Sequence, residues 1–366
     1  MDLMTASTSY QQLQSKYEKF RAPTVCVLVD GTDITQNLKT HLSRVTADLT
    51  CGYAASGVSF DVIGEYEYEQ NSFSAKGVAK VLQLGARVEL KLGYIRTETV
   101  FSGLIAEVRY EFEEDESPYI HVECMDAKCL LMKTQRLEIR SEKKIAPIVS
   151  ALLGAQPVST YLSGRTVDLQ EAEKPPLPFN MESDYDFLVR QAQYTGCEFF
   201  IFAGKAYFRR PPASSAPVMT LEPRQGIARA SFSLRGAPLV KKVTVVGVDP
   251  DSDASVSGSA SAQGSFGKGA GPGRMLSGTE RTYFDARAMS AKDAADRAKV
   301  LMSGIQQQFG QLTCRCIGLP ELVPGRWIRI KGLMPEADTG FYITDVRHVY
   351  SQNGFTTTFD ARISSL

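Results

Sequence analysis

The chain has 366 residues, of which 43% are hydrophobic and 22% charged, which is typical of a folded protein with two or three packed units. Lys and Arg number 41, and so do Asp and Glu, so the basic excess typical of nucleic-acid-binding proteins is absent. The polar N-terminus lacks the apolar core of a signal peptide, and no apolar run approaches the roughly 18 residues of a membrane-spanning helix. We therefore expect synthesis in the cytoplasm without stable membrane insertion.

The N-terminal lead, residues 1–20, is expected to form a short helix or no regular structure. Residues 21–135 then alternate in polarity, which predicts a first antiparallel β-barrel. An acidic turn is expected at Glu113, Glu114, Asp115 and Glu116. Inward-facing side chains are expected at Val88, Leu90 and Leu92, at Ala106, Val108, Tyr110 and Phe112, and at Ile120, Val122 and Cys124.

Residues 136–215 change to an α+β pattern and are expected to form an inserted domain. A first helix is predicted over 141–153 with Ser141 as its N-cap. A second helix is predicted between Ser183, as N-cap, and Gly196, as C-cap. A short hairpin should follow this helix.

Residues 216–366 return to strands and predict a second β-barrel. Within them, the Ser, Gly and Ala content of 249–280 is typical of a flexible loop. A helix is predicted over 290–309, where Ser290 and Asp293 make a capping box.

The two strand regions resemble each other in order and chemistry. Gly85, Val88, Leu90 and Lys91 are spaced like Gly325, Ile328, Ile330 and Lys331; Glu107, Val108 and Arg109 match Asp345, Val346 and Arg347; Asp126 and Ala127 match Asp360 and Ala361. Chance similarity between amphipathic strands explains this pattern, and so does duplication of one barrel. In a trimer, a duplicated barrel gives six similar units around one axis.

Seven cysteines, an odd number, argue against a disulfide framework in a cytosolic chain. Two pairs have the spacing of metal half-sites, Cys124 with Cys129 and Cys314 with Cys316. The three histidines, His41, His121 and His348, are scattered along the chain and provide no ligand spacing near these pairs. Free, partly buried thiols are the favoured interpretation, and we expect no metal.

Other motifs also favour ordinary structural roles. Gly267 and Lys268 resemble a phosphate-binding loop, but the first glycine and the hydroxyl residue of that motif are missing. The acidic turn lacks the spacing of a calcium loop, and Trp327 is expected to pack in a core or interface. We predict no catalytic residues, no cofactor and no enzymatic activity.

A family resemblance appears in five segments, one of which, residues 243–260, resembles a strand of that family leading into an Asp-Pro turn. Residues 183–210 are similar to the helix–hairpin of phage late control protein D and VgrG-type hubs. Residues 279–302, 314–333 and 340–362 resemble the capped helix, the Pro-Gly strand and the closing hairpin of that family. The similarity extends over about 18–366.

The resemblance implies a mainly β fold: two related antiparallel β-barrels with an inserted helix–hairpin region, assembled as a trimeric ring. Such a baseplate hub adapts the six-fold tail tube of a phage or injection system to a three-fold spike, around a central channel. Its expected partners are two further copies, the spike, the tube or tube-initiator protein, and the tape measure protein in the channel, without specific nucleic-acid recognition. Because the chain ends at Leu366, we expect the spike to be a separate protein.

Two alternatives stay open at this stage. A carbohydrate- or effector-binding tail module would show exposed aromatic side chains and a stable monomer. A peptidoglycan hydrolase would show two facing carboxylates in a cleft, about 5–9.5 Å apart.

Overall fold

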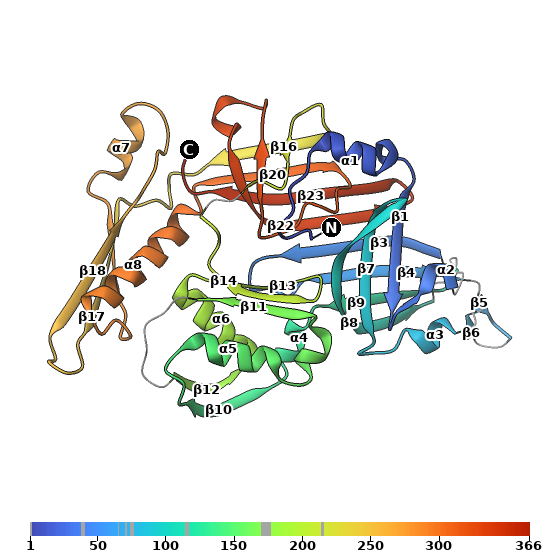
Figure 1. The fold of residues 1–366 in the computed structure, drawn as a ribbon, viewed down its shortest axis with the longest axis horizontal. Coiled ribbons are helices and arrows are strands. Elements are labelled where there is room, and N and C mark those ends of the chain that lie inside the picture. Colours follow the sequence, from blue (N-terminus) through green and yellow to red (C-terminus); the bar gives the residue numbers. More distant parts are fainter. Residues whose placement is uncertain are drawn as a thin grey trace.

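A large antiparallel sheet forms the centre of the molecule, and the remaining elements pack around it (Figure 1). The computed structural model describes the chain except for residues 1, 38–40, 65, 70–71, 74–76, 113, 115–116, 170–176 and 214–215. Three residues of the expected acidic turn, Glu113, Asp115 and Glu116, therefore lie outside the described residues. No described helix is long and apolar enough to cross a membrane.

The N-terminal half-sheet has six main strands in a fixed spatial order. They are β3 (His41–Thr50), β4 (Gly57–Ile63), β9 (Tyr119–Met125), β8 (Arg96–Glu111), β7 (Arg87–Tyr94) and β1 (Pro23–Val29). Val88, Leu90 and Leu92 of β7 are fully buried, as are Ile120 and Val122 of β9. The alternation predicted for these two strands is confirmed, because one face of each strand contacts the core.

The C-terminal half-sheet repeats this order. Its strands are β16 (Ile227–Leu234), β20 (Gly310–Ile317), β23 (Gly354–Ile363), β22 (Gly340–Ser351), β21 (Trp327–Ile330) and β15 (Thr220–Leu221). Thus β16, β20, β23, β22 and β21 occupy the positions of β3, β4, β9, β8 and β7. The repeat favours duplication over chance as the origin of the sequence similarity.

The two half-sheets share one hydrogen-bonded sheet. Strand β22 pairs with β3 in antiparallel register, with Val346 opposite Leu49. In the described part of the chain, this pairing produces a sheet of 13 strands. The fold class is confirmed as mainly β with inserted helices, and a single apolar core extends under both halves.

One expected inward face is wrong in detail. Ala106 lies at a β-bulge in β8 and is exposed, whereas Tyr110 is 46% and Phe112 56% exposed. This end of β8 extends past β7, which pairs with β8 only as far as Leu104. Its apolar face therefore extends beyond the core.

The inserted region has its own hydrophobic core. Its elements are β10 (Gln135–Arg140), α5 (Ile145–Gly154), β11 (Gly164–Asp168), β12 (Leu177–Ser183), α6 (Asp184–Thr195), β13 (Glu198–Phe202) and β14 (Lys205–Arg209). Helix α6 has the predicted caps: Ser183 accepts a hydrogen bond from the Asp186 amide at 3.0 Å, and Gly196 has a φ of +70°. Strands β13 and β14 form the predicted hairpin.

The prediction of Ser141 as an N-cap is wrong. Helix α5 begins at Ile145, with Lys144 at its N-cap. Strand β10 continues to Arg140, so the chain leaves the sheet only after that residue. The later start also places Pro147 in the first turn of the helix, where its missing N–H breaks no helical hydrogen bond.

The segment expected to be a flexible loop contains regular structure. Strand β18 (Ser255–Ser261) pairs along its length with β17 (Lys242–Val248), and helix α7 (Gly271–Leu276) follows. Together with β19 (Glu280–Phe284), these strands form a small sheet packed on helix α8 (Ala291–Gln306). A Cβ on Gly258 would lie 2.2 Å from the Ala295 amide nitrogen, so the small residues permit close packing between strand and helix.

Helix α8 starts as predicted and ends earlier. The Ser290 hydroxyl accepts a hydrogen bond from the Asp293 amide at 3.1 Å. The helix ends at Gln306 rather than 309, because the chain turns there into β20, which begins at Gly310.

The N-terminal lead forms helix α1 (Tyr10–Lys16), which contacts both half-sheets. The Lys16 ammonium lies 2.7 Å from Glu98 of β8 and 2.8 Å from Glu321, which precedes β21. The neighbouring Tyr17 hydroxyl donates to Glu321 at 2.6 Å. Both Tyr17 and Glu321 are fully buried, so α1 joins the two halves through a buried polar contact.

Candidate functional site

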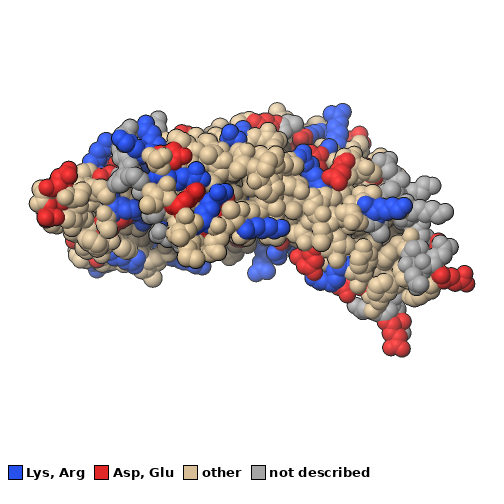
Figure 2. Space-filling model, turned by 90° about the horizontal axis from the view of Figure 1, so that it is seen from below, with Lys and Arg blue, Asp and Glu red and all other residues tan. Residues whose placement is uncertain are grey.

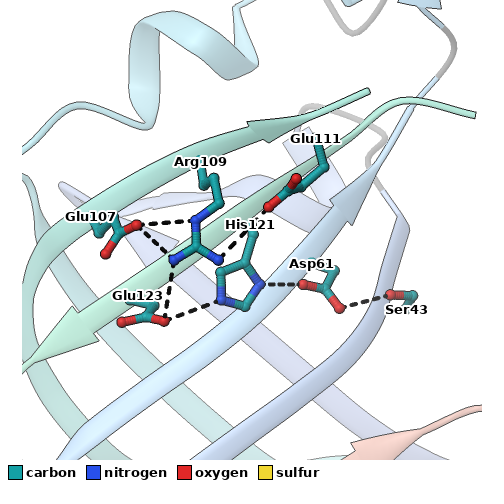
Figure 3. A network of polar contacts seen from close by, with 7 residues as sticks. All are labelled: Ser43, Asp61, Glu107, Arg109, Glu111, His121 and Glu123. Carbon is teal, nitrogen blue, oxygen red and sulfur yellow. Dashed lines mark hydrogen bonds and ion pairs between the residues drawn. The ribbon is translucent and has the colours of Figure 1, made fainter. Parts of the chain in front are cut away.

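A polar network covers the outer face of the N-terminal half-sheet where β8 extends beyond β7 (Figure 3). Its members come from four neighbouring strands: Ser43 of β3, Asp61 of β4, Glu107, Arg109 and Glu111 of β8, and His121 and Glu123 of β9. Strand pairing places them together, since Arg109 lies opposite His121, and His121 opposite Asp61. These residues are called the polar network below.

Arg109 lies at the centre of the carboxylates. Its guanidinium is 2.7 Å from Glu107, 3.7 Å from Glu111 and 4.0 Å from Glu123. The hydrogen bonds that Arg109 donates to the Glu107 carboxylate raise the pKa of Arg109, which stays charged. Four carboxylates face one guanidinium and one imidazole here, so the network has an excess of acidic groups.

His121 bridges two of these carboxylates. Its Nδ1 lies 2.6 Å from Asp61, and its Nε2 lies 3.5 Å from Glu123. Ser43 donates to Asp61 at 3.5 Å, so the serine contacts the aspartate rather than the histidine. A catalytic triad needs the imidazole between serine and carboxylate to accept the serine proton, and this order of contacts does not provide it.

The network borders an open strand edge. Gly85 and Ala86 exchange hydrogen bonds with Ile105, and no strand pairs with β8 beyond that point on this side within the described residues. On the opposite face of the same stretch, Tyr110 contacts Phe73 and Phe112 contacts Tyr66, with ring centroids 6.4 and 5.3 Å apart. An unpaired edge with polar residues on one face and exposed aromatic rings on the other is suited to binding another polypeptide.

The cysteines weighed as metal ligands lie inside the protein. Cys124, Cys314 and Cys316 are buried, and Cys129 is half-buried. Burial raises the pKa of the Cys314 thiol to about 12, which favours the neutral thiol over a metal-binding thiolate. Among the described residues, no group of three or more His, Cys, Asp or Glu is arranged to hold a metal ion.

The remaining residues weighed as site candidates in the sequence make contacts within the fold. Lys268 is exposed and pairs with Glu336, while Trp327 donates a hydrogen bond to the Pro212 carbonyl at 3.0 Å. His348 is buried with its Nδ1 2.9 Å from the Thr357 hydroxyl, and burial lowers the pKa of His348 to about 3. Of the three scattered histidines, only His121 joins the polar network.

The rest of the surface shows mixed charge. Figure 2 shows Lys and Arg interspersed with Asp and Glu across one long face, separated by uncharged side chains. An open hollow of about 310 Å³ lies between β18 and α8, bordered by Ser261, Lys299 and Gln306. The hollow belongs to other elements than the polar network.

Sequence reasoning missed this site. The alternation of Glu107, Arg109 and Glu111 was visible along one strand. Their partners, Asp61 and His121, come from strands whose pairing local periodicity does not specify. The network therefore appears only once the strands are in register.

Comparison with known proteins gives one family model and several solved structures. One family model, described as the Alg8 N-terminal domain, matches residues 21–352. The chain belongs to this family. No curated protein matches the sequence.

Three solved structures illustrate the fold of this family member. A tail protein from Neisseria meningitidis superposes with a TM-score of 0.70 at 15% identity, covering 93% of this chain and 97% of that one. The 43 kDa tail protein of prophage MuSo2 from Shewanella oneidensis gives 0.69 at 11% identity, covering 93% and 98%. An Escherichia coli component of the type VI secretion system gives 0.56 at 11% identity, covering 92% and 76%. At these identities the likeness establishes the fold.

Proposed function

We propose that this chain is a structural baseplate hub of a contractile phage tail or a phage-tail-like injection system, without enzymatic activity. Three copies form a ring around a central channel. One face binds the tail tube or its initiator protein and the other seats the spike, while the tape measure protein occupies the channel. The ring assembles in the bacterial cytoplasm and becomes part of the particle.

The repeated strand order carries this proposal. One chain contains two half-sheets of the same topology, so three copies supply six similar units. Six units match a six-fold tube, whereas three chains match a three-fold spike. The fold shared with tail proteins of Neisseria and Shewanella supports a role in a tail.

Light scattering tests this function on the full chain, alone and mixed with the spike protein of the same particle. We expect a trimer, or a monomer that becomes a trimer when spike is added. A monomer that ignores the spike contradicts the proposal. Lysis of peptidoglycan by the purified protein in a zymogram would contradict the absence of enzymatic activity.

A binding module is the second candidate, because aromatic rings are exposed around Tyr68, Tyr110 and Phe112. Carbohydrate-binding sites commonly present such rings to sugars. A stable monomer that binds immobilised glycans would favour this candidate over the hub.

A further inference from the structure

We propose that the open edge of β8, residues 107–111, pairs with β16 of a second copy of this chain. In this arrangement the junction between copies repeats the junction between β22 and β3 that each chain already contains. The inference rests on the proposed ring and specifies which strands, in which register, hold the ring together.

Strands β8 and β22 are equivalent down to their irregularities. Each has a β-bulge at the same place relative to β9 or β23, between Ile105 and Glu107 in one and between Ile343 and Asp345 in the other. Before the bulge, the same backbone contact occurs twice. The Gly85 amide donates to the Ile105 carbonyl at 2.9 Å, and the Gly325 amide donates to the Ile343 carbonyl at 2.9 Å.

Strands β3 and β16 are equivalent in the same way. The register of β3 on β4 shifts between Leu42 and Val45, and that of β16 on β20 shifts between Ile227 and Arg229. Aligning the neighbouring strands places Ala230 of β16 at the position of Val45. The positions of Ala47 and Leu49 are then occupied by Phe232 and Leu234.

The two halves differ in what lies beside these strands. After its bulge, β22 has β23 on one side and β3 on the other. After its bulge, β8 has β9 on one side and no paired strand on the other, within the described residues. Strand β16 ends the sheet, and β20 is the one strand paired with it in the described part of the chain. Among the residues that the structure describes, the two edges equivalent to those of the β22–β3 junction, one on β8 and one on β16, are thus open.

The observed junction predicts the register of the new one. Within the chain, Leu49 lies opposite Val346, Asp48 opposite Arg347 and Ala47 opposite His348. In the same order, the equivalent pairs between copies are Leu234 with Val108, Ser233 with Arg109 and Phe232 with Tyr110.

Side-chain chemistry agrees with this register on both faces. On the apolar face, Leu234 is 41% exposed and Tyr110 46% exposed. In this register both side chains lie on the same face of the joined sheet, where each would be covered by its neighbours across the junction. On the polar face, Glu107 falls opposite the exposed Arg235. The acidic excess of the polar network therefore meets the positive charge of Arg235, the residue that follows β16.

We infer that the partner is another copy, because the two edges do not meet within one chain. Strands β16 and β8 are separated within the chain by β20, β23, β22, β3, β4 and β9. Such a head-to-tail contact uses different surfaces on the two copies and closes into a ring when its rotation permits. Each copy contributes one internal and one external junction to the ring.

Cross-linking tests the register directly. We expect the double variant Arg109→Cys with Ser233→Cys, treated with oxidised glutathione, to form covalent multimers that end at three chains and disappear on reduction. Each disulfide forms as two thiols lose two electrons and two protons to glutathione. The mismatched control, Arg109→Cys with Ala228→Cys, should give several-fold less product, because its thiols are too far apart.

A second experiment measures assembly by light scattering. Tyr110→Lys places a charge on the open edge, and we expect it to reduce the mass to that of a monomer without changing the circular dichroism. The control is Tyr68→Lys. Tyr68 belongs to the same aromatic cluster but lies in a turn outside β8 and is 69% exposed, so this variant should leave the mass unchanged.

The outcomes separate this inference from the proposed function. A wild-type trimer that persists in Tyr110→Lys, or that cross-links equally in the mismatched control, overturns the strand pairing but leaves the hub intact. A wild-type monomer that neither cross-links nor responds to spike overturns both.

Discussion

At the residue scale, a buried charged pair organises the turn after β3. The Asp126 carboxylate accepts hydrogen bonds from the Ser56 amide at 2.8 Å and the Lys128 amide at 2.9 Å. The fully buried Lys128 ammonium donates to the carbonyls of Ala54, at 2.5 Å, and Gly52, at 3.2 Å. Burial raises the pKa of Asp126 and lowers that of Lys128, so each group depends on the other for its charge.

Replacing this lysine should be costly. We expect Lys128→Met to lower the free energy of unfolding by about 3–5 kcal/mol, since it leaves the buried Asp126 carboxylate without a nearby positive charge and three carbonyls without the ammonium that donates to them. Denaturant unfolding measures the loss, with Lys133→Met, an exposed lysine of the same segment, as control. Equal stability of the two variants would show that Asp126 is neutral or hydrated without Lys128.

At the element scale, close approach explains why a Ser- and Gly-rich segment forms a strand. Val256, Gly258 and Ala260 of β18 face α8, whereas the intervening serines are exposed. Gly247 of the neighbouring β17 approaches the backbone of Ala288, where a Cβ would lie 2.0 Å from the carbonyl oxygen. The small side chains therefore serve packing here, although the same composition is typical of linkers.

This packing predicts a sharp contrast between adjacent positions. Gly258→Ala should lower the free energy of unfolding by about 1–3 kcal/mol, because the added methyl forces β18 away from α8. Ser257→Ala, on the exposed face of the same strand, should change it by less than about 0.5 kcal/mol. Thermal or denaturant unfolding distinguishes the two variants. Equal free energies of unfolding would show that β18 can shift away from α8 without loss of stability.

At the scale of the whole molecule, the β22–β3 junction makes the two half-sheets one structural unit. It brings together Arg347 and Asp48, which are 299 residues apart in the sequence. The Arg347 Nε donates a hydrogen bond to the Asp48 Oδ1 at 2.5 Å. Helix α1 adds the buried contact with Glu321, and one apolar core continues across both halves. The inserted region packs its helices around a separate core.

This architecture predicts which strands unfold together and which unfold locally. In native-state hydrogen exchange, amides of β3 and β22 should exchange together, with the free energy of global unfolding, because neither strand can leave without exposing the common core. Amides of the two-stranded β10–β12 sheet should exchange through a smaller opening. Exchange of β22 at a lower free energy than β3 would show that the halves unfold separately.

The sequence by itself determined the features that depend on neighbouring residues. Alternation identified the buried faces of β7 and β9, the caps at Ser183 and Ser290 located two helix starts, and matched spacing indicated the repeated half. These signals act within one turn or one strand, where each residue's preference is local.

Only the tertiary structure decided what depends on distant partners. It assigned β18 to a sheet rather than a loop, left Tyr110 exposed where β8 extends past β7, and gathered the polar network from four strands. Strand pairing joins segments hundreds of residues apart, and a strand's own pattern does not reveal which neighbour it has or whether it has one. The open edges of β8 and β16 are therefore properties of the assembled sheet.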